Sequence, residues 1–237
     1  MALVAHRVTT TTTSTIVETH ALTKRYGGLE VVRAVTVALP AGSRTALIGA
    51  NGAGKTTLLA MLCSLTAPSD GDATIAGHSL RARPAELRRA IGVLAHRPML
   101  YEDLTPLENL GFFARLYDVP DAEARIEELL RTVGLWNRRH EAVAVFSRGM
   151  HQRLALARAL LHRPAILLAD EPETGLDPEG IEMLDALVMR APDLTVIAAT
   201  HRIDRIEAWA TGLVRLEHGR VIEDTASVPG TSAEVRA

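Results

Sequence analysis

The sequence of 237 residues contains little cysteine, few aromatic residues and almost no lysine. Cys63 is its only cysteine, which excludes an intrachain disulfide and is typical of a reducing compartment. No apolar run approaches the roughly 18–20 residues that a membrane-spanning helix needs. The first apolar stretch, residues 2–5, is far too short for the core of a signal peptide. These absences predict a cytoplasmic protein.

The charge balance excludes a further class of partner. The formal net charge is only −2 and the basic residues form no stripe along the sequence, so nothing in the composition favours binding to a nucleic acid. Hydrophobic residues make up 47% of the chain, which is enough to fill a substantial core at this length. We therefore expect a globular protein without a nucleic-acid partner.

One of the two lysines occupies a position with a defined chemistry. Lys55 belongs to the segment Gly49–Thr57, which reads GANGAGKTT and matches the G-x-x-x-x-G-K-[ST] pattern of the Walker A phosphate-binding loop. A strand-like run precedes the segment and a helix-like run follows it, so a functionless glycine-rich turn is a poor alternative. The nucleotide-binding residues that this motif predicts are Gly49, Asn51, Gly52, Ala53, Gly54, Lys55, Thr56 and Thr57.

The chemistry of the motif explains its residue types. Glycines let backbone N–H groups curl around an anion, and the helix that follows directs its positive end at the same place. Lys55 would add a point charge beside the terminal phosphates of a nucleotide, which makes it a catalytic candidate. The Thr56 hydroxyl would take a position on Mg²⁺.

Two adjacent acids end a second apolar run. Residues 166–169, Ile-Leu-Leu-Ala, are followed by Asp170 and Glu171. Charge at the end of a buried strand is costly unless it is used, and a metal-bound phosphate would use it. We therefore expect Asp170 to hold Mg²⁺ through its coordination shell and Glu171 to orient and polarise the attacking water. Two acids after an apolar run are common in proteins, but together with the phosphate loop upstream they indicate a site for a metal-bound phosphate.

Strand-like and helix-like patterns alternate along most of the chain, which predicts an α/β fold with a parallel sheet and a ligand at the carboxyl ends of its strands. Strands are expected at 16–20, 31–39, 45–48, 73–76, 91–95, 166–169, 195–199 and 213–216, and helices from about 56, 106, 121, 178 and 202. The helix-rich segment of about 84–162 is interpreted as an inserted lobe. Residues 1–15 are expected to be a flexible leader, 16–224 a single domain and 225–237 a loose tail.

Four further segments resemble motifs of ABC-type ATPases. Residues 146–160 are similar to the signature motif of that family, which lies shortly before the acidic strand, as it does here. Thr174–Asp177 resembles the family's D-loop, His201 its switch histidine, and Tyr26 the aromatic residue that stacks on adenine. The resemblance extends over about residues 16–224, with every motif in order.

The resemblance implies a P-loop NTPase fold, with a RecA-like mixed sheet as its core, an antiparallel β subdomain and an inserted α-helical signature subdomain. It also implies a head-to-tail dimer that binds ATP and Mg²⁺, in which the phosphate loop of one subunit faces the signature of the other. Ser147 would offer a hydroxyl and Gly149 a bare backbone N–H to the γ-phosphate. The signature residues assigned in this way are Ser147, Arg148, Gly149 and Met150.

The resemblance assigns roles to the remaining residues. Glu171 would act as the base, His201 would sense the γ-phosphate, and Asp177 would contact the partner subunit. ATP hydrolysis would drive a separately encoded membrane permease, which would hold the chain at the cytoplasmic face of the membrane. The active pair would be a homodimer or a heterodimer with a related ATPase subunit.

Two regions depart from the family's pattern. His96, in His-Arg-Pro, stands where the family has a glutamine, and we interpret it as the equivalent of that Q-loop residue. Arg148 and Met150 replace the usual small residue and glutamine of the signature. The resulting Ser-Arg-Gly-Met form resembles ATPases of exporters, including the haem exporter of cytochrome c maturation. It predicts export rather than import.

The few aromatic residues are clustered. Four of them, Tyr101, Phe112, Phe113 and Tyr117, lie within one short segment, which in the family faces a cytoplasmic helix of the permease. They would line a groove for that helix, or they would form the core of the helical lobe, and the sequence leaves both open. Tyr26 has its own alternative, which is to pack against a turn.

Other functions fit the sequence less well. Soluble ABC proteins that act on ribosomes or DNA usually carry two ATPase units or a long coiled coil, and this sequence has neither. A nucleotide-binding regulatory module with little hydrolysis is supported only by His96, whereas Glu171 and His201 oppose it. A GTPase would need an Asn-Lys-x-Asp motif, which the sequence lacks.

Overall fold

The computed structural model describes residues 14–82, 84–191 and 193–227. The flexible leader predicted for residues 1–15 therefore lies outside the described residues except at its end, where Thr15 already begins the first strand. The domain predicted to begin near residue 16 thus begins with a hydrogen-bonded strand.

The loose tail predicted from Thr225 is wrong for its first residues. Thr225 Oγ1 accepts a hydrogen bond from the Leu213 N–H at 3.0 Å, and Ser227 Oγ accepts one from the Ala38 N–H at 2.9 Å. These side-chain oxygens satisfy backbone donors at the sheet margin, which the absence of periodicity in the sequence did not reveal. The rest of the predicted tail, residues 228–237, lies outside the described part of the chain.

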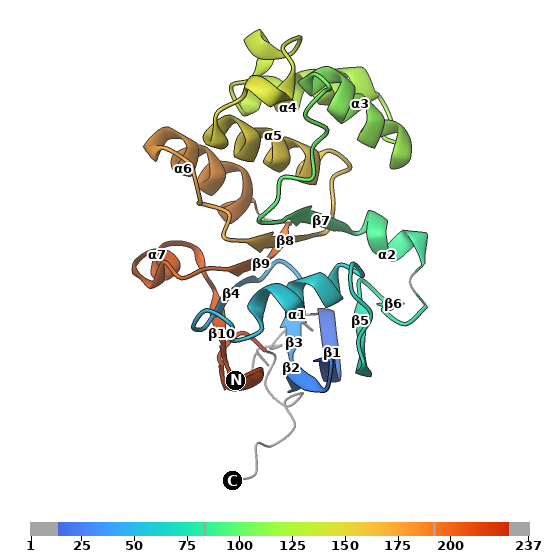
Figure 1. Ribbon diagram of the computed structural model, residues 1–237, viewed down its shortest axis with the longest axis vertical. Helices are drawn as coiled ribbons and strands as arrows, with labels where there is room; N and C mark the ends of the chain where they lie inside the picture. Colours follow the sequence, from blue (N-terminus) through green and yellow to red (C-terminus); the bar gives the residue numbers. More distant parts are fainter. Residues whose placement is uncertain (1–13, 83, 192, 228–237) are drawn as a thin grey trace, which may run out of the picture.

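A six-stranded sheet forms the centre of the molecule (Figure 1). Its strand order is β11-β10-β4-β9-β8-β7, and every neighbouring pair is parallel except β10 and β11. This mixed sheet confirms the predicted α/β fold. The strands are β4 (Arg44–Ile48), β7 (Ile91–Leu94), β8 (Ile166–Asp170), β9 (Thr195–Ala199), β10 (Gly212–Glu217) and β11 (Arg220–Asp224).

The central strands are buried on both faces. Successive residues of a strand point to opposite sides. In β8, Leu167 and Ala169 pack into one hydrophobic core, whereas Ile166 and Leu168 pack into another. The first core is shared with the helices in the upper half of Figure 1, and the second with the helix α1 (Lys55–Leu62) and the second sheet. Burial on both faces explains why these strands are continuous apolar runs in the sequence.

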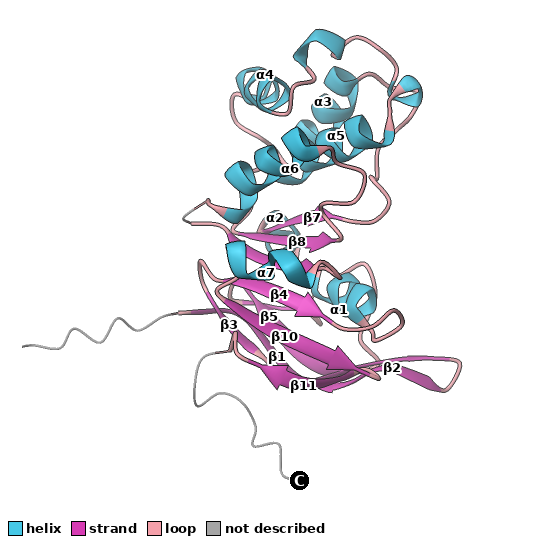
Figure 2. Ribbon diagram, turned by 90° about the vertical axis from the view of Figure 1, so that its left-hand side faces the viewer, coloured by secondary structure: helices cyan, strands magenta, loops and turns pink. Residues whose placement is uncertain are grey.

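An antiparallel sheet covers the second core (Figure 2). Its order is β2-β1-β5-β6, and β3 also pairs with β1. The strand predicted over 31–39 is divided into β2 and β3. The buried Thr19 hydroxyl donates to the Val35 carbonyl and accepts from the Val37 N–H, both at 3.0 Å, and so bridges the break. The strands are β1 (Thr15–Tyr26), β2 (Leu29–Val35), β3 (Ala38–Pro40), β5 (Asp70–Ile75) and β6 (His78–Ser79).

The helical lobe lies above the sheets in Figure 1, and its helix nearest the sheet shares a hydrophobic core with the central strands. It holds α3 (Pro106–Leu116), α4 (Ala122–Thr132), α5 (Arg148–Leu160) and the short 3-10 turns η1 (Trp136–Arg138) and η2 (Val143–Val145). The predicted start of the lobe, near residue 84, is too early. The segment that follows contains α2 (Ala85–Arg89) and β7, and β7 extends the central sheet by pairing Ile91 with Ile166 of β8.

Three further helical segments connect the last strands. They are α6 (Pro178–Leu184), the π-helical turn η3 (Asp185–Met189) that continues it, and α7 (Ile203–Trp209). Across the described ranges, no helix is both long and apolar enough to cross a membrane.

Candidate functional site

The phosphate loop joins β4 to α1, and the backbone of neighbouring strands lies close against its first and last glycines. Gly49 has φ 152° and Gly54 has φ 105°, a backbone that favours glycine. A Cβ atom at Gly49 would lie 2.3 Å from the Leu216 carbonyl oxygen of β10, and one at Gly54 would lie 2.7 Å from the Val31 carbonyl oxygen of β2. Both glycines are therefore required by close backbone contact as well as by their own conformation.

The ammonium of Lys55 lies inside this loop. The residue is only 9% exposed, and its Nζ donates hydrogen bonds to the carbonyl oxygens of Gly49 at 2.7 Å and Ala50 at 3.1 Å. The first turn of α1 contains no acidic residue that would compensate the positive end of the helix. A buried cation and an uncompensated helix end together form a site that favours an anion.

Thr56 and Asp170 meet at the mouth of the loop. The Thr56 hydroxyl donates a hydrogen bond of 2.8 Å to Asp170 Oδ2 at the end of β8. A hydroxyl and a carboxylate are hard oxygen ligands, which Mg²⁺ prefers. The described residues contain no group of three or more His, Cys, Asp or Glu side chains that could hold a metal by themselves. The pair fits Mg²⁺ as it is bound in phosphate sites, by few protein oxygens together with phosphate and water.

Glu171 and His201 lie side by side at the ends of β8 and β9. His201 Nδ1 is 3.2 Å from Glu171 Oε1, and Thr174 Oγ1 donates to Glu171 Oε2 at 3.3 Å. Glu171 has a left-handed backbone with φ 52°, and its N–H donates to the Ala199 carbonyl at 2.9 Å. The left-handed turn directs this carboxylate away from the continuing sheet and beside the imidazole. The structure thus brings together the two residues predicted as base and switch.

The predicted signature residues begin α5 and touch the D-loop. Ser147 is the N-cap of α5, and its Oγ accepts a hydrogen bond from the Met150 N–H at 3.2 Å. The stem of Arg148 lies over Gly175, where a Cβ would come within 2.9 Å of Arg148 Cγ. A Cβ at Gly149 would come within 3.0 Å of the Gly175 carbonyl oxygen. Signature and D-loop therefore pack as one surface within the subunit.

Asp177 is held by its own subunit. It is the N-cap of α6, and its Oδ1 accepts from the Gly180 N–H at 2.9 Å and from Arg153 Nη2 at 2.7 Å. The Arg153 hydrogen bond, followed by that of Gly180, lowers the pKa of Asp177. The Arg153 contact was not predictable from the sequence, because Arg153 could equally lie on a solvated helix face. The predicted contact of Asp177 with a partner subunit stays a prediction.

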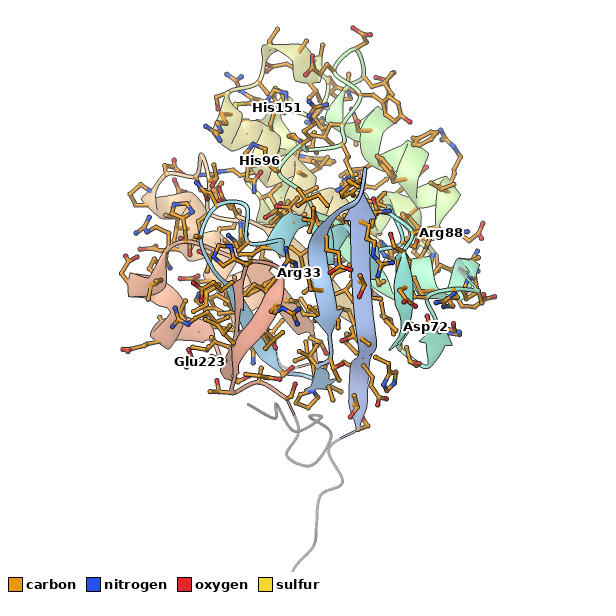
Figure 3. All side chains as sticks on the ribbon, turned by 60° about the horizontal axis from the view of Figure 1, so that its bottom comes forward. Arg33, Asp72, Arg88, His96, His151 and Glu223 are labelled. Carbon is orange, nitrogen blue, oxygen red and sulfur yellow. The ribbon has the colours of Figure 1, made fainter. Side chains whose placement is uncertain are left out.

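His96 shares a cavity with the acidic residues. The cavity, of about 370 Å³, is lined by His96, Pro98, Glu102, Phe146, Arg148, His151, Gln152, Asp170, Glu171 and Thr174. Figure 3 labels His96 and His151, which approach it from the segment after β7 and from α5. Gln152 Nε2 donates to the Pro172 carbonyl at 3.0 Å and so supports the loop that follows Glu171. Sequence reasoning missed Gln152 and His151, since only their position in the fold brings them here.

Tyr26 ends β1 and is half exposed, at 50%. The Lys24 ammonium lies 4.8 Å from the centre of its ring. None of the hydrogen bonds or ring contacts found between described residues joins Tyr26 to the phosphate loop, so its stacking on adenine stays a prediction.

The aromatic residues of the lobe differ in burial, and the docking role predicted for them stays a prediction. Tyr101, Phe112 and Phe113 form a cluster in which Phe112 lies 5.2 Å from each of the other two ring centres. Phe113 packs against the lobe core, whereas Tyr101 is 49% exposed. Tyr117 stacks on His162 with ring centres 4.0 Å apart, and burial lowers the pKa of His162.

Comparisons with known proteins identify the family of the chain. A family model described as ABC transporter matches residues 32–174. The bacitracin transport ATP-binding protein BcrA of Bacillus licheniformis is 36% identical over 214 residues, which cover 89% of this chain and 70% of the relative. A solved ATP-binding subunit of an ABC transporter superposes with a TM-score of 0.84 at 33% identity, covering 90% of each chain.

A second solved structure is an ATP-binding cassette described as a dimer in a post-hydrolysis state with ADP and Pi. It superposes with a TM-score of 0.80 at 26% identity and covers 89% of this chain and 98% of that one. The family match, the sequence relative and the two structures all indicate the same family. The chain belongs to the ABC transporter family and has the α/β phosphate-loop fold of that family's ATPase subunits.

Proposed function

We propose that this chain binds and hydrolyses MgATP as the ATPase subunit of an ABC transporter. The observation that carries the proposal is the meeting of the Thr56–Asp170 pair and the Glu171–His201 pair beside the phosphate loop. Together these groups offer an anion site, hard oxygen ligands and a carboxylate held beside an imidazole, which are the parts that phosphoryl transfer needs.

In the proposed reaction the residues of the loop position the triphosphate. Lys55 Nζ, now bonded to backbone carbonyls, would turn to the terminal phosphates, and the loop N–H groups would hold the anion. Thr56 and Asp170 would hold Mg²⁺, which neutralises phosphate charge when it is bound. Glu171 would accept a proton from the attacking water, and His201 and Thr174 would fix the two oxygens of its carboxylate.

We propose further that two subunits pair head to tail, as homodimer or heterodimer. Ser147 and Gly149 lie at the N-terminal end of α5, where a hydroxyl and an unobstructed N–H favour a γ-phosphate held by the partner. The dimeric state of the related cassette with ADP and Pi supports this arrangement. Asp177, on the D-loop beside the signature, would lie at the same interface.

The proposed partner beyond the dimer is a membrane permease on another chain, which would hold this subunit at the membrane's cytoplasmic face. A groove beside β7 has the apolar character that a helix of such a partner would bind. Leu65 is 59% exposed and Met99 41% exposed within it. Its lining residues include Cys63, Leu65, Ile91, Val93, Met99, Tyr117, Arg158 and His162. The Ser-Arg-Gly-Met signature favours an exporter as that permease.

The experiment that tests the activity is MgATP hydrolysis by the purified chain over a wide range of protein concentration, beside Glu171→Gln. We expect turnover per subunit to rise with concentration and the variant to bind ATP while losing about 10²–10³-fold or more in turnover. Glu123→Gln, an exposed acid on α4, is the matched control. If Glu171→Gln hydrolysed ATP at the wild-type rate, Glu171 would not be the base. If the wild-type chain bound ATP firmly but did not hydrolyse it even with the permease present, the chain would be a regulatory module.

The proposed docking groove has its own test. Met99→Glu would place a charge in the apolar groove, so we expect it to reduce sedimentation with permease-containing membranes while turnover in solution stays unchanged. If the variant sedimented like the wild type, the groove would not be the docking surface.

A further inference from the structure

Arg205 connects three segments behind the Glu171–His201 pair. It lies on α7, the helix that follows His201. Its Nη1 is 3.5 Å from Glu173 Oε1, two residues beyond Glu171, and its Nη2 donates to Asp185 Oδ2 at 2.6 Å in η3. One guanidinium therefore joins the loop after β8, the helix after β9 and the turn that continues α6.

These three side chains are largely shielded from water. The exposed fractions are 19% for Arg205, 10% for Glu173 and 21% for Asp185. Screening by salt is weak at such depth, so the charges act on one another more strongly than an exposed pair does.

The cluster is not arranged for greatest stability. Glu173 Oε2 and Asp185 Oδ1 are buried without a hydrogen-bond partner in the described structure. Burial raises the pKa of Glu173, although Arg205 and Arg202 oppose the rise. A carboxylate that is shielded and half satisfied costs free energy of folding. Its presence here needs a reason other than stability.

Arg205 joins the two segments whose relative position sets the distance between Glu171 and His201. Glu171 and His201 touch at 3.2 Å, and His201 is 61% exposed, so their own contact is a weak restraint. Between the loop 171–174 and the segment 200–209, the side-chain links found in the described structure are this contact and the Arg205–Glu173 pair. Backbone pairing adds the Glu171 N–H to Ala199 bond at the strand end.

We propose that Arg205 is a positioning residue, which locks the loop carrying Glu171 to the helix behind His201 and so fixes the two side chains for ATP turnover. The inference rests on the proposed roles of Glu171 and His201. Arg205 touches neither nucleotide nor water in this scheme, and it acts through Glu173 and Asp185. The half-satisfied carboxylate of Glu173 lowers the stability of the fold, but it fixes the distance between the loop 171–174 and the segment 200–209.

The test compares Arg205→Met, Arg205→Lys and Glu173→Gln with Arg215→Met in the full chain. Arg215 of β10 forms an exposed ion pair at 2.8 Å with Glu223 of the edge strand β11, so its variant is a control that loses one arginine–carboxylate contact. For each protein we would measure kcat, KM for MgATP, the melting temperature and the imidazole NMR signal of His201, assigned with His201→Gln.

We expect Arg205→Met and Glu173→Gln to lower kcat by roughly threefold to thirtyfold with KM changed less than about twofold. Arg205→Lys should recover part of the loss, and Arg215→Met should lose nothing. Glu173→Gln should melt no lower than the wild type, because Arg205 keeps Asp185 as its partner and a half-satisfied buried carboxylate is removed. The His201 signal should shift in Arg205→Met and Glu173→Gln even if the chain needs its permease for turnover.

A purely structural role gives a different pattern. Arg205→Met and Glu173→Gln would then melt lower while kcat and the His201 signal stayed at wild-type values, which overturns the proposal. If Arg205→Met failed to fold, Glu173→Gln and Arg205→Lys would decide by the same measurements. If Glu171→Gln kept its ATPase activity, the proposed role of Glu171 itself would be wrong. Because this result comes from a different variant, it is distinguishable from a failure of the Arg205 proposal.

Discussion

The Thr56 hydroxyl donates a hydrogen bond of 2.8 Å to Asp170 Oδ2 across 114 positions of sequence. The contact places the first turn of α1 against the end of β8, and it leaves a hydroxyl and a carboxylate converging on one point. These are the two groups proposed to hold Mg²⁺, and because they come from two elements, each can be substituted while the other is kept.

Asp170→Asn should separate charge from geometry at that position. Asparagine still accepts the Thr56 hydrogen bond, but it lacks the negative charge that Mg²⁺ requires. We expect turnover to fall about 10²–10³-fold and the Mg²⁺ concentration for half-maximal activity to rise. Thr56→Ser, which keeps the hydroxyl, is the control and should stay near wild type. An unchanged Mg²⁺ requirement in Asp170→Asn would show that the metal is held elsewhere.

Gly49→Ala should destabilise the fold as well as the site. A Cβ there would lie 2.3 Å from the Leu216 carbonyl oxygen at a φ that favours glycine. We expect the free energy of unfolding to fall by about 2–4 kcal/mol in urea titrations. Gly111→Ala is the matched control, since its Cβ would meet only the tip of Arg115, 3.9 Å away within α3. It should stabilise by about 0.5–1 kcal/mol. Equal stability of Gly49→Ala and wild type would contradict the close contact.

The Arg153–Asp177 pair predicts a pH dependence of stability. Because the folded-state pKa of Asp177 is lowered, the pair stabilises the fold above the ordinary aspartate pKa, and the contribution is lost as pH falls through the lower, folded pKa. The melting temperature of Arg153→Met should therefore approach that of the wild type in strong acid and lie below it at neutral pH. A difference between the two proteins that is constant across this range would speak against the pair.

Cys63 should react slowly while the protein is folded. It is 8% exposed, and burial raises the pKa of its thiol, so little thiolate is present near neutral pH. Mass spectrometry after brief iodoacetamide treatment should find almost no adduct on the native chain and one adduct in urea. Rapid alkylation of the native protein would show that the end of α1 opens easily.

Tyr26→Ala should weaken binding of ATP more than binding of inorganic tripolyphosphate. Stacking of a base on an aromatic ring is worth about 1–3 kcal/mol, so the affinity for ATP should fall roughly fivefold or more in calorimetry. Tyr26→Phe keeps the ring and serves as the control. Equal loss for both ligands would favour packing against the turn as the function of this tyrosine.

The motifs were predictable because each is local in the sequence. The phosphate loop, the acids after β8 and His201 after β9 follow from short patterns, and adjacent parallel strands bring their carboxyl ends together. The contacts of Arg153 and Arg205 were not predictable, since they depend on how helices rotate against loops far away in the chain. The strand break bridged by Thr19 was also missed, because a buried hydroxyl that replaces ladder bonds leaves no periodic signal.

The alternation of β8 between two cores has a consequence for the acids at its end. Side chains repeat every two residues along a strand, so a slip of one residue against β9 would exchange the residues facing each core. Asp170, now paired with Ala199, would then move to the position from which Glu171 leaves the sheet. The four apolar side chains of 166–169 thus decide which carboxylate meets the Thr56 hydroxyl and which meets the imidazole. A substitution among them that favoured the slipped register would therefore alter the site without changing either acid.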